Sequence, residues 1–139
     1  MKPNDANTEY CIKYTEYVNG LRARRGGWQD GDWVFLNGKS RLIRRVRGSD
    51  YAIYTLIDSA WYKLEIGYVW LPSEGDVLGM LENVLDADQR EQWHDTWQLT
   101  RDRFRGPYCA ALIYDDDTYG LGETPLIALL ELLKAVESK

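Results

Sequence analysis

The sequence predicts an α+β fold in which an antiparallel sheet, made of a meander and a hairpin, packs against about three to four helices. Two observations predict this class. Apolar residues recur at three- and four-residue steps near the start, the middle and the end of the chain, as on the buried face of a helix. Between the first two of these segments lie short aromatic and β-branched runs separated by glycine-containing turns. The length of 139 residues, 45% of them hydrophobic, predicts one domain over residues 7–139 after a flexible terminus at 1–6.

The first predicted helix covers residues 7–24. Tyr10, Tyr14 and Val18 recur at the helical spacing. Three arginines in its last turn suit the negative end of the helix dipole, and the Gly-Gly pair at 26 and 27 ends the helix.

A meander of strands is predicted next. The dipeptide Asn37-Gly38 stands between two apolar runs, and both central residues of a type I′ hairpin turn need a positive φ. A second turn is expected at residues 48–50. The four expected strands are residues 33–36, 41–47, 51–57 and 61–66.

The second half begins with a helix that Ser73 can cap and that ends near Leu85. A short helix from residue 86 or 88 to His94 follows, and residues 97–100 alternate like a strand. A longer helix that reaches Phe104 also satisfies the spacing of this segment.

The end of the chain predicts a strand, a loop and a helix. Residues 108–114 form an apolar run, and the acidic and glycine-rich residues 115–122 are typical of a turn or short loop. Thr124 and Pro125 then provide an N-cap and a first-turn proline for a helix that extends to Val136.

Three short motifs mark the starts of these elements: Gly31-Asp32-Trp33, Trp70-Leu71-Pro72-Ser73 and Gly122-Glu123-Thr124-Pro125-Leu126-Ile127-Ala128-Leu129. Their order resembles small hypothetical proteins encoded by bacteriophages and prophages. In these proteins a GDW strand start, a WLP(S/T) helix start and a terminal TP..AL helix recur. The resemblance implies a phage-derived accessory protein that binds host or phage proteins, and it assigns no functional residue.

The composition argues against secreted and membrane-bound classes. No apolar run approaches the roughly 18 residues that cross a bilayer, and no hydrophobic segment follows the polar start as in a signal peptide. Cys11 and Cys109 lie in different predicted elements, so free thiols are favoured over a disulfide. We therefore expect a cytoplasmic protein that makes no contact with a membrane.

No catalytic constellation is predicted. His94 is the single histidine, and no serine or cysteine nucleophile accompanies it in a suitable context. The run Asp115-Asp116-Asp117 could hold a hard cation, but it lacks the order of an EF-hand loop and is more typical of a solvated turn. Glu123 and these aspartates would repel a phosphate at the last helix start. We expect no enzyme, no metal and no cofactor.

Charge is distributed unevenly along the chain. Residues 1–47 hold ten Lys/Arg and five Asp/Glu, a net charge of +5, whereas residues 48–139 hold seven and seventeen, a net charge of −10. Such asymmetry bears on partners rather than on fold. The strand with Arg41, Arg45 and Arg47 on one face, followed by Tyr51 and Tyr54 on the next strand, predicts an alternative function in nucleic-acid binding. The pI near 4.9 argues against it.

The sequence therefore favours a non-enzymatic protein-interaction module with a host or phage protein as partner, and self-association into a homo-oligomer is a further expectation. Tryptophan, tyrosine and arginine are enriched at interface hot spots, and acidic surfaces attract basic partners. The candidate interaction residues are Trp28, Trp33, Arg41, Arg44, Arg45, Arg47, Tyr51, Tyr54, Asp115, Asp116 and Asp117.

Overall fold

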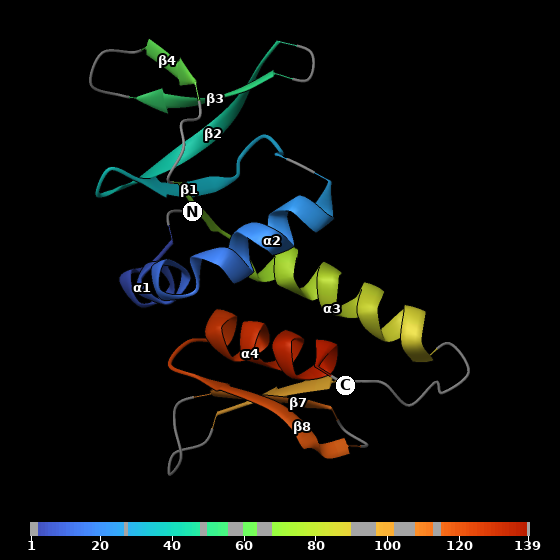
Figure 1. Cartoon of the computed structure of the whole chain (residues 1–139). Helices are drawn as coiled ribbons and strands as arrows, with labels where there is room; N and C mark the ends of the chain where they lie inside the picture. Colours follow the sequence, from blue (N-terminus) through green and yellow to red (C-terminus); the bar gives the residue numbers. More distant parts are fainter. Residues whose placement is uncertain are drawn as a thin grey trace. The chain divides into compact units, whose positions relative to one another are not determined.

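The structure is a computed structural model, and its described residues form four helices and two antiparallel sheets (Figure 1). The predicted α+β class is confirmed. The described ranges are 3–26, 28–47, 50–55, 60–63, 68–89, 97–101, 108–112 and 115–138. Contacts divide the chain into two compact units, Met1–Pro72 and Ser73–Lys139, which are described in turn.

The first unit begins with two helices, α1 (Asp5–Lys13) and α2 (Thr15–Arg25), where the sequence predicted one. The backbone of Tyr14 leaves the helical conformation, with φ −114° and ψ 42°. The hydroxyl of Thr15 donates to the carbonyl oxygen of Ile12 at 2.7 Å, and such bonds compete with the helical ladder and bend helices. This local competition explains the break, which apolar spacing alone could not indicate.

The predicted end of α2 is confirmed. Gly26 adopts the left-handed conformation with φ 103°, and its N–H donates to the carbonyl oxygen of Ala23. The last turn carries Arg22, Arg24 and Arg25, as the dipole favours.

The first unit also contains a five-stranded antiparallel sheet with the order β4-β3-β2-β1-β5. The hairpin turn is confirmed, since Asn37 and Gly38 have φ values of 51° and 78°. The sequence missed β5, a three-residue strand that pairs with β1 and is too short for a period to show. The strands are β1 (Trp33–Leu36), β2 (Lys39–Arg47), β3 (Asp50–Thr55), β4 (Ala60–Lys63) and β5 (Val69–Leu71).

Both faces of β1 are packed. On one face Trp33 and Phe35 pack against a buried cluster, and on the other face Val34 and Leu36 are buried together with Ile43. The first cluster consists of Cys11, Val18, Val69 and Leu71. Because the cluster joins both helices to β5, it fixes α1 and α2 on one face of the sheet near its β5 edge.

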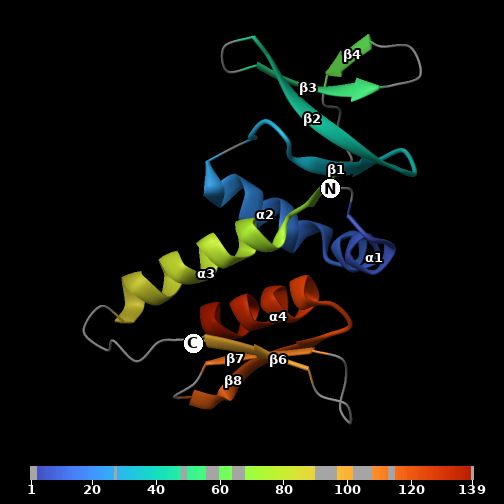
Figure 2. The ribbon, with the colours of Figure 1, turned by 180° about the vertical axis from the view of Figure 1, so that it is seen from behind.

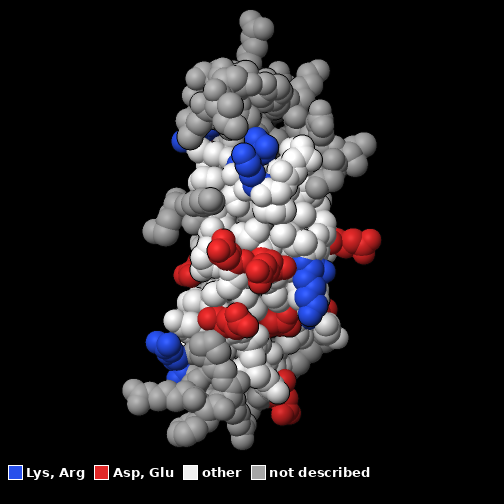
Figure 3. Space-filling model, turned by 90° about the vertical axis from the view of Figure 1, so that its left-hand side faces the viewer, with Lys and Arg blue, Asp and Glu red and all other residues white. Residues whose placement is uncertain are grey.

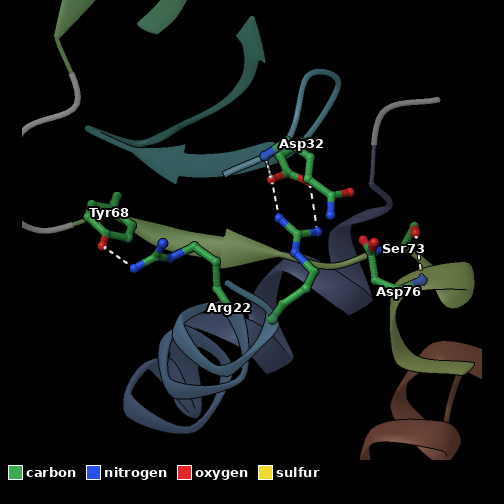
Figure 4. Close-up of polar contacts among 7 residues, drawn as sticks. Arg22, Asp32, Tyr68, Ser73 and Asp76 are labelled. Carbon is green, nitrogen blue, oxygen red and sulfur yellow. Dashed lines mark hydrogen bonds and ion pairs between the residues drawn. The ribbon is translucent and has the colours of Figure 1, made fainter. Parts of the chain in front are cut away.

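The second unit contains α3 (Glu74–Gln89), a three-stranded sheet with the order β6-β7-β8, and α4 (Pro125–Glu137) (Figure 2). The predicted cap of α3 is confirmed. Asp76 N–H donates to Ser73 Oγ at 3.1 Å and Ser73 N–H donates to Asp76 Oδ2 at 2.9 Å, a reciprocal capping box (Figure 4). The helix continues past the predicted end at Leu85, since no glycine or proline follows there. The rest of the predicted short helix up to His94 lies outside the described residues.

The three strands are β6 (Trp97–Thr100), β7 (Tyr108–Leu112) and β8 (Asp115–Gly122). The predictions for β6 and for the start of β7 are confirmed. The prediction of a turn or loop over residues 115–122 is wrong, because this segment is β8 and pairs antiparallel with β7. Gly120 and Gly122, which suggested a turn in the sequence, are strand residues without a positive φ.

Helix α4 explains these glycines, because it lies directly on one face of β8. A Cβ on Gly120 would overlap the backbone nitrogen of Leu132 and the carbonyl oxygen of Ala128, so only glycine allows this approach. The helix starts as predicted, with the Thr124 hydroxyl accepting from the N–H of Ile127 at 3.2 Å. Packing against α4 therefore defines an inner face of the three-stranded sheet, and the other face is its outer face.

None of the described helices combines the length and the apolar character that crossing a membrane requires.

Candidate functional site

The outer face of the β6-β7-β8 sheet carries two exposed large hydrophobic side chains, the most exposed among the described residues of the second unit. Tyr119 is 49% exposed and Leu121 is 42% exposed. They alternate with the buried Thr118 and Gly120, as the two-residue period of a strand requires. Within the second unit, Figures 1 and 2 draw no described element on the face opposite α4. The described residues of this unit therefore leave the face uncovered.

Acidic residues stand at both ends of this exposed pair. Asp117 precedes Tyr119 by two residues and Glu123 follows Leu121 by two, and both acidic residues are exposed. Asp117, Tyr119 and Leu121 of β8, together with Glu123 directly after the strand, are named the β8 row. The row presents an aromatic and an aliphatic side chain between two carboxylates.

The neighbouring strands extend the outer face with small and neutral side chains. Ala111 pairs with Tyr119 on one side and with Gln98 on the other, and directly opposite residues share a face. Cys109 likewise lies between Leu121 and Thr100. These neighbours carry no charge, so the charge on the described outer face comes from the β8 row.

The unit that carries this face is acidic as a whole. Ser73–Lys139 holds six Lys/Arg and fourteen Asp/Glu, a net charge of −8, whereas Met1–Pro72 holds eleven and eight, a net charge of +3. Figure 3 shows one face of the molecule, on which acidic side chains (red) lie in clusters among uncharged ones (white). The charge split predicted from the sequence thus coincides approximately with the division into two units.

The predicted acidic candidates lie at the start of β8. Asp115, Asp116 and Asp117 belong to this strand rather than to a turn, and Asp117 is exposed. The side chains of Asp115 and Asp116 lie outside the described part of the structure. Within the described residues, no three or more His, Cys, Asp and Glu side chains are grouped so that they could hold a metal ion.

Trp28, another predicted candidate, belongs to an arginine-aromatic cluster of the first unit. The Arg22 guanidinium lies 4.5 Å from the ring centre of Trp28 and 5.6 Å from that of Tyr68. Arg22 Nη2 also donates to the Tyr68 hydroxyl at 3.1 Å (Figure 4). The two rings meet edge to face at 5.1 Å. Cation-π and ring contacts of this kind hold α2 against the segment that leads into β5.

A second arginine of α2 forms a buried ion pair. Arg25 Nη1 and Nη2 donate to the two carboxylate oxygens of Asp32 at 3.1 and 2.5 Å, and the side chains are only 12% and 6% exposed (Figure 4). The N–H of Gln29 donates to the same carboxylate at 2.8 Å. The Arg25 guanidinium also lies 4.7 Å from the ring centre of Trp70. Asp32 therefore has a structural role within the Gly-Asp-Trp motif.

The side chain of Asn19 bonds to β5 as a neighbouring strand would. Its amide nitrogen donates to the carbonyl oxygen of Tyr68 at 3.0 Å, and its oxygen accepts from the N–H of Trp70 at 2.9 Å. These bonds satisfy the backbone carbonyl of Tyr68 and the N–H of Trp70 at the β5 edge of the sheet. The neighbouring candidate Trp33 is half-buried against the cluster that contains Cys11.

The basic strand β2 is less regular than the nucleic-acid hypothesis assumed. Ile43 is buried on the face that Arg41 shares, and the pairing register shifts between Arg45 and Arg47. Arg41 Nε donates to the carbonyl oxygen of Leu36 at 3.3 Å. Arg44, on the opposite face, pairs with Asp30 at 3.3 Å. The side chains of the remaining candidates, Arg45, Arg47, Tyr51 and Tyr54, lie outside the described part of the structure.

Both cysteines are free, as predicted, but their surroundings differ. Cys109 is half-buried on the outer sheet face, whereas Cys11 is fully buried between α1 and the sheet. Burial raises the pKa of the Cys11 thiol from 9.0 to about 12, because the thiolate would lose its hydration. Cys11 therefore acts as an apolar core residue.

We expect the stability difference between the wild-type protein and Cys11→Ala to depend on pH. Between pH 9 and 12 the unfolded thiol ionises while the folded thiol stays protonated. The thiol's contribution is therefore complete below pH 9 and decreases as pH rises, with a limiting slope of about 1.4 kcal/mol per pH unit. Urea unfolding of both proteins at pH 8, 9 and 10 measures it, and a constant difference would contradict the burial of the thiol.

Comparison of the chain with known protein families, curated proteins and solved structures gives no match. The candidate site therefore depends on the geometry of this chain alone.

The sequence prediction missed Tyr119 and Leu121 because it placed both residues in a loop. The available signal was their two-residue spacing, which continues from Asp117 to Glu123. Glycines at alternate positions obscured it, because glycine is more often a turn residue than a strand residue.

Proposed function

We propose that this chain is a non-enzymatic protein-interaction module that binds a protein partner through the outer face of the β6-β7-β8 sheet. The exposure of Tyr119 and Leu121 on this face, which the described residues of its own unit leave uncovered, is the observation that carries the proposal. Exposed apolar side chains bordered by polar ones are typical of protein interaction sites. In line with the resemblance to phage-encoded proteins, the module is an accessory or counter-defence protein with a host protein as partner.

Two properties of the described site support a binding role. Its side chains stand on strands that α4 fixes from behind, so the surface is preorganised and loses little entropy when it binds. Tyrosine provides a large contact area with few rotatable bonds and a hydroxyl for hydrogen bonding. Free thiols are typical of reducing compartments, and we place the action of the module in the cytoplasm.

Nucleic-acid binding through β2 is the alternative function. Arg41 and Arg44 already bond within the unit, which reduces their availability for phosphate. If β2 binds nucleic acid, the protein should shift the electrophoretic mobility of labelled DNA or RNA at about 50 mM salt, where phosphate contacts are strong. The Arg44→Ala variant should lose this mobility shift.

Affinity capture tests the proposed function. The tagged chain should enrich a specific protein from a lysate of the host cells, and Tyr119→Ser combined with Leu121→Ser should reduce that enrichment at least about tenfold. Ile12→Ser is the matched control, since Ile12 is 41% exposed but belongs to α1. Quantitative mass spectrometry of the captured proteins measures the effect. Equal capture by all variants, or no specific capture, would rule out the proposed site.

A further inference from the structure

We infer that the β8 row receives a basic protein segment, in which apolar residues lie between two lysines or arginines. This inference rests on the proposed function and specifies its partner. Tyr119 and Leu121 alternate on the outer face of β8, Asp117 precedes them where the pairing register with β7 shifts, and Glu123 directly follows the last residue of the strand; all four are exposed. The order acidic, aromatic, aliphatic, acidic is complementary to a segment of the order basic, apolar, apolar, basic.

The spacing of Tyr119 and Leu121 sets the spacing of the matching apolar residues. A strand rises about 3.4 Å per residue, so these two residues lie about 7 Å apart along β8. An extended segment presents side chains on one face with the same two-residue period. Its two apolar residues should therefore stand two positions apart, with a basic residue on either side of the pair.

The charge of the second unit favours the same partner. The two basic residues that the structure describes there are engaged with other residues: Lys134 pairs with Glu131 at 3.2 Å, and Arg101 lies 5.6 Å from the ring centre of Tyr108. With a net charge of −8, this unit attracts a basic protein segment and repels the phosphates of a nucleic acid.

A second copy of the chain is a poorer occupant of this face. If two copies packed face to face around a two-fold axis with antiparallel rows, Asp117 of one copy would oppose Glu123 of the other. With parallel rows, each acidic residue would oppose itself. Both arrangements bring like charges together while apolar surface is buried, which is unfavourable. A basic segment instead brings opposite charges to the acidic residues of the row.

A displayed library of random peptides tests the inference. The library is selected on the immobilised full-length chain and depleted on the variant that combines Tyr119→Ser and Leu121→Ser. We expect the remaining peptides to carry lysine or arginine on both sides of two apolar residues. Enrichment of neutral or acidic peptides would overturn the inference and leave the proposed function standing. Failure to enrich any peptide that depends on Tyr119 and Leu121 would overturn both.

Charge variants then test the role of the row's ends. Asp117→Asn combined with Glu123→Gln should weaken binding of a selected peptide about tenfold or more, measured by calorimetry at low salt. Glu74→Gln combined with Glu82→Gln removes the same number of exposed charges from α3 and should change the affinity less than about twofold. Circular dichroism confirms that each variant folds. Equal losses in both pairs would show that net charge alone attracts the peptide and would overturn the assignment to the row.

Discussion

Replacing Gly120 by alanine is expected to destabilise the protein by about 3 kcal/mol or more. The added Cβ would overlap the backbone nitrogen of Leu132 and the carbonyl oxygen of Ala128 in α4. Backbone atoms cannot move aside as the end of a flexible side chain can, so α4 would have to lift from β8. This shift would expose buried apolar residues of α4, among them Leu129, Leu132 and Leu133. Urea unfolding followed by circular dichroism measures the free-energy change.

Gly79→Ala is the control for this prediction. Gly79 lies inside α3, is exposed, and would place its Cβ in open space. Alanine is preferred over glycine within a helix, so this variant should be stabilised by about 1 kcal/mol. The two substitutions are chemically identical and differ in environment. If Gly120→Ala were neutral or stabilising, α4 would not approach β8 as closely as the structure shows.

The sequence predicted those features that local chemistry determines. Asn37-Gly38, Ser73 and Thr124-Pro125 each marked a turn or helix start correctly, because the residue that signals the feature also makes its defining contact or dihedral angle. Gly120 shows the limit of such reasoning. The sequence indicated a turn at Gly120. Glycine is required there because the backbone of α4, which follows later in the chain, packs directly against this residue. Nothing within a few residues of Gly120 carries that information.

The candidate site was harder to predict for a related reason. The acidic character of the second half was visible in the sequence, and Asp117 was among the candidates. Tyr119 and Leu121 became candidates only because the structure shows that their segment is a strand, which pairs with β7 and has an exposed outer face. Trp28 shows the converse. Its residue type suggested an interface, whereas its ring contacts Arg22 and Tyr68 of the same unit.

Asp32→Ala is expected to have the other large effect, a loss of about 3–5 kcal/mol in the free energy of unfolding. The substitution removes both carboxylate oxygens that accept from Arg25, whose side chain is only 12% exposed, and it removes the acceptor for the N–H of Gln29. The cost is large because the guanidinium stays in a poorly hydrated place after its counter-charge has gone. Chemical denaturation at neutral pH measures the loss.

Asp30→Ala provides a control only two residues away. Asp30 pairs with Arg44 at 3.3 Å, but the two side chains are 52% and 46% exposed, so water screens the pair. Its loss should cost at most about 1 kcal/mol. A double-mutant cycle completes the test, because Arg25→Ala combined with Asp32→Ala removes both charges of this pair and should cost less than the sum of the single variants. Additive single and double effects would mean that the two side chains do not stabilise each other. Asp32 of the Gly-Asp-Trp motif would then stabilise the fold through its bond with the N–H of Gln29 rather than through the ion pair.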